Sequence, residues 1–379
     1  MLSLLSRREM LTALAAAPIA FQVSHTDQSD RPRNDAGLAT TRGSRPARLR
    51  HGAAIRPEQL TADTPLLAAI RKCDILVPEF HGQWSAVEWR RGNPWFGNYD
   101  LILAFAEAQG QAVRGHSLIW EQMTPEWARR EMLDERDWRT VERHFASLLP
   151  RYEGRIEDWI VVNEMIDTEH GEDNIRRTSF QRAYGSSYVL RALETARQFD
   201  SSASLMINEY GLYFDNPIDE ARRVALVQLA EDLKKRGAPL DKIGLQGHLE
   251  LSKGVIPQRR LERFFADLAN TGVKLAVTEL DVLEADRTRP IAERDTIVAD
   301  AIQSFLDVAT EQPALDSIVT WGLSDRDSWL QERDTTTKVA LGCSPVDCSS
   351  LNRGLPYDAD MRPKLMLSSL SSHGAARLA

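Results

Sequence analysis

The sequence lacks the features that mark several specialised classes of protein. Its 379 residues contain only 3 cysteines, too few for a disulfide framework, and no HExxH pair or other compact set of metal ligands. No glycine-rich phosphate-binding loop follows the first predicted strand. The net charge of −8 argues against nucleic acid or an anionic membrane surface as a partner. We therefore expect a globular protein without a metal or a cofactor.

A long hydrophobic run is also missing. Within residues 1–25, Arg7-Arg8 precedes an Ala/Leu-rich stretch that is too short to span a membrane comfortably. This pattern resembles a bacterial twin-arginine export signal; the alternative is an amphipathic helix that carries two arginines by chance. Residues 26–48 are polar and rich in Arg, Pro and Asp, which predicts a disordered linker. We expect an exported protein, periplasmic or secreted, with no membrane anchor after cleavage.

The cysteines are expected to play different parts. Cys73 begins an apolar run and is predicted to be a buried small hydrophobe. Cys343 and Cys348 are close enough in sequence to close a small loop in an oxidising compartment. The sequence leaves open whether they form a disulfide.

The same pattern of strands and helices repeats from residue 49 to residue 370. We predict that these residues form a single catalytic domain and that residues 371–379 are a C-terminal tail. Short apolar runs alternate with segments of helical periodicity, and Gly110, Gly237 and Gly272 stand where helix C-caps are expected. The predicted strands are residues 52–55, 73–80, 111–120, 156–164, 204–210, 243–249, 274–281 and 317–323. Eight continuous apolar strands, each followed by a helix, predict an α/β fold, the (β/α)8 TIM barrel.

Polar and aromatic residues gather at the ends of these strands. They are Glu79, His116, Trp120, Asn163, Glu164, Asn208, Glu209, Tyr210, Gln246, His248, Glu279, Asp281 and Trp321. Catalytic groups of this type of barrel project from the C-terminal ends of its strands. One such residue alone is usually a solvated loop residue or a structural histidine, but a whole rim of them predicts a site. Metal binding by His116, Glu164, His248, Glu279 and Asp281 is an alternative, which their spacing does not favour.

Glu164 and Glu279 end the fourth and seventh strands and are predicted to be a catalytic pair. Two opposed carboxyl groups can hydrolyse a glycosidic bond if their environments separate their pKa values. His248 and Asp281 are expected to keep Glu279 ionised as the nucleophile. The strand neighbours of Glu164 are apolar, so burial is expected to raise its pKa for the role of proton donor. Asn163 is expected to bind a hydroxyl of the sugar that is cleaved.

Several motifs share one family resemblance. They are "VRGHSLIW", "TPEW", "WIVVNE", "INEY", "IGLQGHL", "VTELDV" and "WGLSDRDSWL", spread over roughly residues 50 to 368. In order and spacing they resemble glycoside hydrolase family 10, the (β/α)8 endo-β-1,4-xylanases. The resemblance implies a retaining double displacement with Glu164 as acid/base and Glu279 as nucleophile. It also implies that a set of side chains lines the active site: Glu79, Trp84, His116, Trp120, Asn163, Asn208, Tyr210, Gln246, His248, Trp321 and Trp329.

The chain departs from the family pattern after its second strand. Where the family has "PENxxKW", this chain has "PEFHGQW", so that Phe80 replaces the asparagine and Gln83 replaces the lysine. Gln83 is expected to contact substrate in place of the lysine, and Phe80 could stack on a sugar ring. Loss of the polar pair should cost about 1–3 kcal/mol for each lost hydrogen bond to sugar.

The sequence thus predicts a monomeric retaining endo-1,4-β-xylanase that acts on a polysaccharide. One alternative is a hydrolase of another β-linked polymer, such as a bacterial exopolysaccharide, which the changes at Phe80 and Gln83 favour. The other is a glycan-binding barrel without catalysis, which the retained glutamates disfavour. No separate carbohydrate-binding module is recognisable, so capture of the polymer is expected to rest on the cleft of the barrel.

Overall fold

A computed structural model describes residues 48–61, 64–331 and 350–374, all within one compact unit, residues 46–379. The predicted export signal, the predicted linker up to residue 47, and Cys343 and Cys348 lie outside the described residues.

The described part of the chain alternates strands and helices. In order these are β1 (Arg50–Ile55), η1 (Pro57–Leu60), α2 (Pro65–Ile70), β2 (Ile75–Pro78), α3 (Trp84–Val87), α4 (Gly97–Gln109), β3 (Ala112–Gly115), η2 (Glu121–Met123), α5 (Glu126–Glu135), α6 (Arg139–Tyr152), β4 (Asp158–Asn163), α7 (Ser179–Tyr184), α8 (Tyr188–Phe199), β5 (Ser204–Glu209), α9 (Pro217–Lys235), β6 (Lys242–Leu245), β7 (His248–Glu250), η3 (Leu251–Lys253), α10 (Gln258–Asn270), β8 (Lys274–Leu283), α11 (Ile291–Ala309), β9 (Leu315–Thr320), η4 (Asp325–Asp327), η5 (Trp329–Gln331) and α12 (Leu365–Ser372).

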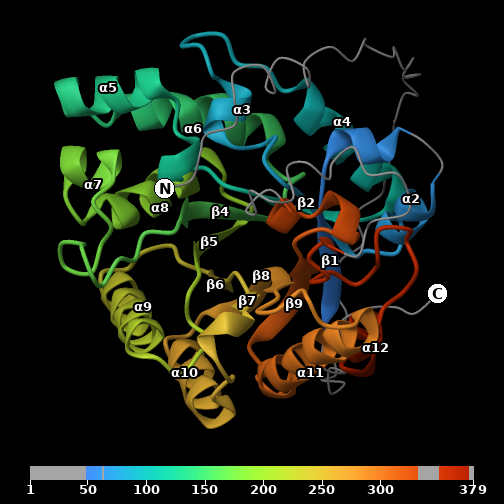
Figure 1. Cartoon of the computed structure of the whole chain (residues 1–379). Helices are drawn as coiled ribbons and strands as arrows, with labels where there is room; N and C mark the ends of the chain where they lie inside the picture. The colour runs from blue at the N-terminus through green and yellow to red at the C-terminus, as the bar shows by residue number, and fades with distance from the viewer. Residues whose placement is uncertain (1–47, 62–63, 332–349, 375–379) are drawn as a thin grey trace, which may run out of the picture. The chain divides into compact units, whose positions relative to one another are not determined.

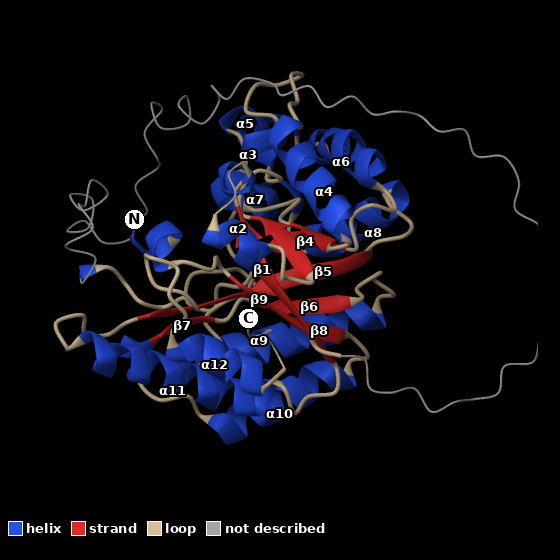
Figure 2. Cartoon of the chain, turned by 90° about the vertical axis from the view of Figure 1, so that its right-hand side faces the viewer, coloured by secondary structure: helices blue, strands red, loops and turns tan. Residues whose placement is uncertain are grey.

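Eight of the strands close into a parallel barrel. Each of β1 to β5 pairs with the next strand, β6 pairs with β8, and β9 pairs with both β8 and β1. Helices surround the strands, as Figures 1 and 2 show. The short strand β7 extends the rim by pairing with the last residues of β8. The predicted (β/α)8 barrel is confirmed, and closure places the C-terminal ends of all eight strands at one face.

All eight predicted strands are present, but some differ from the prediction. The run 111–120 is a strand only over Ala112–Gly115, so that His116 and Trp120 lie beyond its end, and the run 274–281 continues to Leu283. The run 243–249 is two strands, because Gly247 has a φ of +83° and turns the chain between β6 and β7. The predicted helix ends are also confirmed. Gly110 is the left-handed C-cap of α4, while Gly237 and Gly272 follow the C-caps of α9 and α10 by one residue with positive φ.

Charged groups fill the N-terminal end of the barrel interior. Arg114 on β3 donates to Asp158 at the start of β4, with Nε 2.6 Å from Oδ1. Lys242 on β6 contacts Asp158 at 2.9 Å and Asp316 on β9 at 2.7 Å. Above them lies an apolar layer of Ile160, Met206 and Ala276. Because these two layers of side chains fill the N-terminal end of the barrel, a site can form only at the C-terminal ends of the strands.

The outer core lies between the barrel and its helices. Cys73 belongs to it and is a buried free thiol, which confirms its expected role. None of the helices in the described ranges has the length and apolar character needed to cross a membrane.

Candidate active site

Glu164 and Glu279 lie at the same rim of the barrel. Glu164 follows β4, and its backbone N–H donates to the carbonyl of Asn208 on β5 at 3.0 Å. The backbone N–H of Glu279 on β8 donates to the carbonyl of Gln246, which follows β6, at 2.7 Å. Parallel pairing of neighbouring strands therefore places the two acids on one face, as their positions in the sequence predict.

A continuous chain of hydrogen bonds joins the two carboxyl groups through three amide side chains. Gln246 Nε2 donates to Glu164 Oε1 and to Asn163 Oδ1, both at 3.3 Å. Asn208 Nδ2 donates to the same Asn163 oxygen at 2.9 Å and to Glu279 Oε1 at 2.7 Å. Amide groups cannot titrate, so this chain orients the acids without exchanging protons with them.

The surroundings of Glu279 favour its carboxylate form. Burial would raise its pKa, but the hydrogen bond and charge of His248 and the hydrogen bond from Asn208 act against burial, and the pKa is lowered. His248 Nε2 lies 3.2 Å from Glu279 Oε2, opposite the oxygen that Asn208 contacts. Both oxygens are thus held by donors, and the carboxylate is fixed in direction.

His248 acts as a cation between two carboxylates. Its Nδ1 lies 2.7 Å from Asp281 Oδ1, and the other Asp281 oxygen accepts the indole N–H of Trp329 at 2.6 Å. Burial would lower the pKa of His248, but Asp281 and then Glu279 raise it to about 10. The predicted cluster of His248, Asp281 and Glu279 is confirmed.

Glu164 has the opposite protonation preference. Burial first, and then the charges of Glu209 and Glu279, raise its pKa to about 7, against the nearby indole of Trp120 and the charge of Arg176. The expected direction and cause are confirmed. Besides its apolar strand neighbours, Glu164 has two polar partners that were not expected: Gln122 on η2 donates to Glu164 Oε2 at 3.4 Å, and Gln246 contacts the other oxygen.

Three charged side chains hold the backbone on which Glu164 stands. Glu164 has a left-handed φ of +59°, which costs free energy for any residue other than glycine. Arg176 Nε donates to the Glu164 carbonyl at 2.9 Å. Two residues further on, Glu209 accepts the Ile166 N–H at 2.7 Å and Arg222 donates to the Ile166 carbonyl at 2.9 Å. The strained conformation is therefore stabilised at the carbonyl of Glu164 itself and at the backbone of Ile166.

Glu209 brings a second negative charge close to Glu164. Burial raises the pKa of Glu209, against the charge of Arg222 and the hydrogen bonds from the backbone of Ile166 and Tyr210. Arg222 donates to Glu209 Oε1 at 2.6 Å, and the Tyr210 N–H donates to the same oxygen at 3.0 Å. Since every partner donates, the carboxylate form is the one that satisfies all of them.

Aromatic rings form the wall beside Glu279. Trp321, just beyond β9, contacts the buried ring of His116 edge-on at 5.1 Å and the ring of His248 at 6.4 Å. Trp329 is half-buried, with its ring 5.0 Å from that of His248. Burial lowers the pKa of His116 despite the nearby charge of Glu279, which favours a neutral imidazole. That His116, Trp321 and Trp329 contact substrate, as the family resemblance implies, stays a prediction.

Trp120 and Tyr210 lie on the side of Glu164. Trp120 is half-buried at the start of η2. Tyr210 is half-buried with its ring between two guanidinium groups, 4.4 Å from Arg222 and 5.7 Å from Arg176, and Arg176 donates to its hydroxyl at 2.8 Å. The arginines fix the plane of the Tyr210 ring beside the acid.

The segment after β2 differs from the family pattern in structure as well as in sequence. Glu79 is clamped by Arg56, whose Nε and Nη2 lie 2.5 and 2.8 Å from its two oxygens. Phe80 stacks on His81 with ring centroids 4.1 Å apart, and the Arg56 guanidinium lies 5.8 Å from the Phe80 ring. Gln83 is buried, donating to the Glu79 carbonyl at 3.3 Å while its own oxygen has no protein partner.

Three expectations of direct substrate contact need correction. Trp84 is only 2% exposed, and its ring stacks on His144 at 4.2 Å within the core, so it cannot present a face to a sugar. Asn208 is 0% exposed, and both of its amide hydrogens serve Asn163 and Glu279. Gln246 is 1% exposed and holds Asn163 and Glu164. These two amides position the catalytic pair instead of binding sugar.

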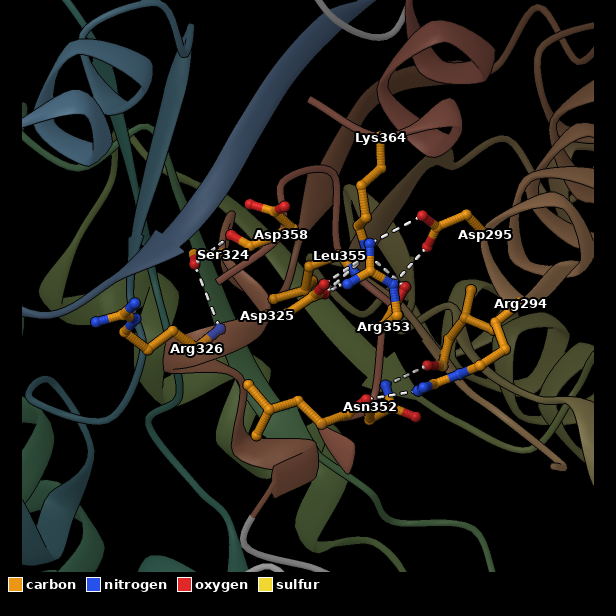
Figure 3. A network of polar contacts seen from close by, with 12 residues as sticks. Arg294, Asp295, Ser324, Asp325, Arg326, Asn352, Arg353, Leu355, Asp358 and Lys364 are labelled. Atoms are coloured by element: carbon orange, nitrogen blue, oxygen red, sulfur yellow. Dashed lines mark hydrogen bonds and ion pairs between the residues drawn. The ribbon is translucent and has the colours of Figure 1, made fainter. Parts of the chain in front are cut away.

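A buried polar network holds the end of β8 in place (Figure 3). Asn352 donates to the Val282 carbonyl at 2.8 Å and accepts the Glu284 N–H at 3.0 Å. Glu284 is held bidentately by Arg294 on α11 at 2.7 and 2.8 Å. The carbonyl of Asn352 also accepts from Gln331 on η5 at 2.9 Å. The strand that carries Asp281 and the turn that carries Trp329 are thereby tied to one segment.

The same segment is anchored at two more points. Arg353 pairs bidentately with Asp295 on α11 at 2.7 and 2.8 Å. Lys364 pairs with the buried Asp325 of η4 at 2.7 Å (Figure 3). Within the described ranges no cluster of three or more His, Cys, Asp and Glu residues is placed to hold a metal ion.

The sequence did not predict that Arg176, Arg222 and Gln122 belong to the site, nor that Glu209 acts on Glu164. Glu209 was visible as a polar residue at a strand end. The burial of the two arginines could not be predicted, because the residues next to a buried arginine in the sequence do not differ from those next to an exposed one.

Comparisons with known proteins show the family of the chain. Residues 44–372 match the model of Glycosyl hydrolase family 10. Endo-1,4-beta-xylanase 3 of Hypocrea jecorina is 32% identical over 269 residues, 69% of this chain and 70% of that protein. Endo-1,4-beta-xylanase B of Paenibacillus barcinonensis is 29% identical over 298 residues, 74% of this chain and 85% of that protein.

Solved structures show the same fold. Xylanase 10B from Thermotoga petrophila, in complex with xylobiose, superposes with a TM-score of 0.73 at 21% identity and covers 86% of this chain and 94% of its own. Native xylanase 10B from Thermotoga maritima has a TM-score of 0.73 at 22% identity, covering 87% and 95%.

Proposed function

Because the chain belongs to glycosyl hydrolase family 10, we infer that it is a retaining endo-1,4-β-xylanase in which Glu164 is the acid/base and Glu279 the nucleophile. One observation carries the assignment of roles. The two carboxyl groups share one hydrogen-bonded rim, yet the pKa of Glu164 is raised to about 7 while that of Glu279 is lowered. A pair separated in this direction supplies one proton donor and one anion near neutral pH.

In the first step, an oxygen of Glu279 attacks the anomeric carbon as the bond to the leaving sugar breaks. Glu164 gives its proton to the departing oxygen, so the leaving chain departs as a neutral alcohol. The products are a glycosyl ester on Glu279 and an ionised Glu164. His248, which contacts Glu279 Oε2 at 3.2 Å, holds that carboxylate ionised and in place until it attacks.

In the second step, Glu164 takes a proton from water while the water oxygen attacks the anomeric carbon. The ester bond breaks, Glu279 returns as a carboxylate and Glu164 is again protonated. Two inversions restore the original configuration of the sugar. Asn163, beside Glu164, is placed to bind a hydroxyl of the sugar at the cleavage point, since its oxygen is already fixed by Asn208 and Gln246.

A second candidate substrate is another β-linked polysaccharide, such as a bacterial exopolysaccharide. The segment after β2 favours it, because both Glu79 oxygens are engaged by Arg56 and Phe80 stacks on His81. Release of reducing ends from xylan, mixed-linkage glucan and host exopolysaccharide separates the two, with Glu279→Ala as the inactive control. Cleavage of xylan in preference to the others supports the xylanase; cleavage of another polymer alone overturns it.

Two further proposals rest on the sequence. The Arg7-Arg8 pattern supports export through a twin-arginine route, to the periplasm or the medium. A variant with both arginines changed to lysine should accumulate as uncleaved precursor in the cytoplasm; normal export of that variant would overturn the proposal. A monomer is proposed for the mature protein, and sedimentation equilibrium measures it.

A further inference from the structure

Two tryptophans on one loop lie exposed to solvent. Trp89 is 52% exposed and Trp95 47% exposed, both in the loop between α3 and α4. All 9 tryptophans of the chain fall in its described part, and the other seven are buried or half-buried. A protein seldom leaves large aromatic rings in water without a use, and two in one short loop indicate a binding surface.

The loop is held by the surrounding structure. Glu88 accepts the Gly92 N–H at 2.6 Å through its side chain and the indole N–H of Trp127 on α5 at 3.1 Å through its carbonyl. Arg91 pairs with Glu131 on α5 at 2.7 Å. These contacts fix the loop between α3 and α5, which lie together in Figure 1. The exposure of the rings is therefore a fixed property of the fold.

Each indole is supported on one side and open on the other. The Arg90 guanidinium lies 4.4 Å from the Trp89 ring centroid. The Trp95 N–H donates to the Val87 carbonyl at 2.7 Å, and its ring lies against Gly97, where a Cβ atom would come within 2.6 Å of Trp95 Cζ2. Only glycine at 97 allows this position of the ring, so the open faces are preserved by local packing.

The loop lies at the catalytic end of the barrel. β2 and β3 are parallel, so α4 must run back from the C-terminal end of β2, and the loop that precedes α4 lies at that end. Gln83 lies at the same end, and Trp89 follows it by six residues. The two Cα atoms are therefore at most about 20 Å apart, the reach of a fully extended chain. The rings lie on the β2 side of the rim, beyond the segment of Glu79 and Gln83.

We propose that Trp89 and Trp95 form a second glycan-binding surface, which takes the β-1,4-xylan chain outside the catalytic cleft. The proposal rests on the proposed xylanase function. A pyranose ring presents an apolar C–H face that stacks on an indole and a polar edge that hydrogen-bonds. Arg90, Arg91 and Asn93, all exposed beside the rings, supply donors for such edges.

The test measures xylan binding by affinity electrophoresis with the catalytic cleft occupied. Wild-type enzyme is first inactivated with 2,4-dinitrophenyl 2-deoxy-2-fluoro-β-xylobioside, which forms a stable ester on the nucleophile. The inactivated enzyme should still bind xylan, and Trp89→Ala with Trp95→Ala should weaken that binding at least 10-fold. The control changes two other exposed apolar residues, Ile218 and Val255, to alanine and should bind as the wild type does.

Activity separates this surface from the cleft. The double tryptophan variant should keep its kcat/KM on an aryl β-xylobioside, while its rate on insoluble xylan falls several-fold. Unchanged xylan binding by the double variant, or no binding by the inactivated wild type, overturns the proposal. Failure of the reagent to inactivate, with no turnover of the aryl xylobioside, would instead overturn the proposed function. In that case the difference in xylan binding between wild type and the double variant still decides whether the two tryptophans bind glycan.

Discussion

His248 Nε2 lies 3.2 Å from Glu279 Oε2, while its Nδ1 lies 2.7 Å from Asp281 Oδ1. The imidazole thus joins the proposed nucleophile to a second, buried carboxylate. Asp281 keeps His248 protonated, and protonated His248 keeps Glu279 ionised. The charge of Asp281, which acts through His248, therefore sets the protonation state of Glu279.

The first prediction concerns Asp281→Asn. Without its carboxylate partner His248 loses its charge at a lower pH, and the pKa of Glu279 rises because a charged donor is lost. The acid limb of kcat/KM should therefore move to higher pH than in the wild type. The control is Trp329→Phe, which removes the hydrogen bond to Asp281 but no charge and should leave the limb in place. Equal acid limbs in Asp281→Asn and wild type would contradict the role given to His248.

The second prediction concerns Glu164. Its pKa is raised to about 7, so kcat/KM on xylan should fall as the pH rises through about 7 and the proton donor is lost. Glu164→Ala should lower kcat/KM on xylan by about 100- to 10,000-fold, the range of general acid catalysis. It should affect the first step on a 2,4-dinitrophenyl xylobioside much less, since that leaving group needs no proton. Added azide should give a glycosyl azide of retained configuration; equal losses on both substrates would oppose the acid/base role.

The third prediction concerns Glu209→Gln. This change removes a negative charge beside Glu164, so the pKa of Glu164 should fall and the alkaline limb of kcat/KM should move to lower pH. Glu284→Gln is the matched control. Glu284 is also buried and paired with an arginine, Arg294, but it lies just beyond the end of β8 and not beside Glu164. If both variants shift the limb alike, a general loss of stability explains the effect and the local charge does not.

The fourth prediction concerns the closed end of the barrel. Arg114→Met leaves Asp158 with only Lys242 as a cation, and breaking such a buried pair costs about 3–5 kcal/mol of unfolding free energy. Arg130→Met, which breaks an exposed pair with Glu126, should cost about 0–1 kcal/mol. Urea unfolding at pH 7 measures both, and equal losses would contradict the importance of burial.

Asp158 also predicts an acid dependence of stability. Burial would raise its pKa, but Arg114 and Lys242 outweigh burial and lower it to about 2. Because the folded-state pKa lies below the unfolded one, near 4, the contribution of Asp158 is complete above about pH 4 and is lost as the pH falls toward 2. In Arg114→Met the folded-state pKa of Asp158 rises toward the unfolded one, so the free energy of unfolding should fall less between pH 5 and pH 3 than it does in the wild type, which urea unfolding at the two pH values would reveal.

The barrel and its rim could be predicted because both depend on local pattern. Apolar runs locate the strands, and parallel closure brings their polar C-terminal residues together whatever their distance in sequence. Glu164 and Glu279 are 115 positions apart, yet their place at strand ends was enough to pair them. The split of residues 243–249 into two strands depends on the left-handed φ of Gly247, which a run of apolar residues does not reveal.

The direction of individual side chains could not be predicted in this way. Trp84 follows a strand end as its family motif requires, but its ring packs on His144 and beside Trp127, two residues of other elements. Asn208 lies at a strand end with its amide turned inward to Glu279. Which polar group meets sugar and which meets a neighbour depends on packing between distant segments, and a single sequence does not contain that information.

The central claim is that Glu279 forms the covalent bond to sugar. Inactivation with 2,4-dinitrophenyl 2-deoxy-2-fluoro-β-xylobioside, followed by proteolysis and mass spectrometry, tests it directly. We predict that one fluoroxylobiosyl group is attached to the peptide that contains Glu279, and that fragmentation places it on that side chain. A label on any other residue, or undiminished turnover without a label, would contradict the account.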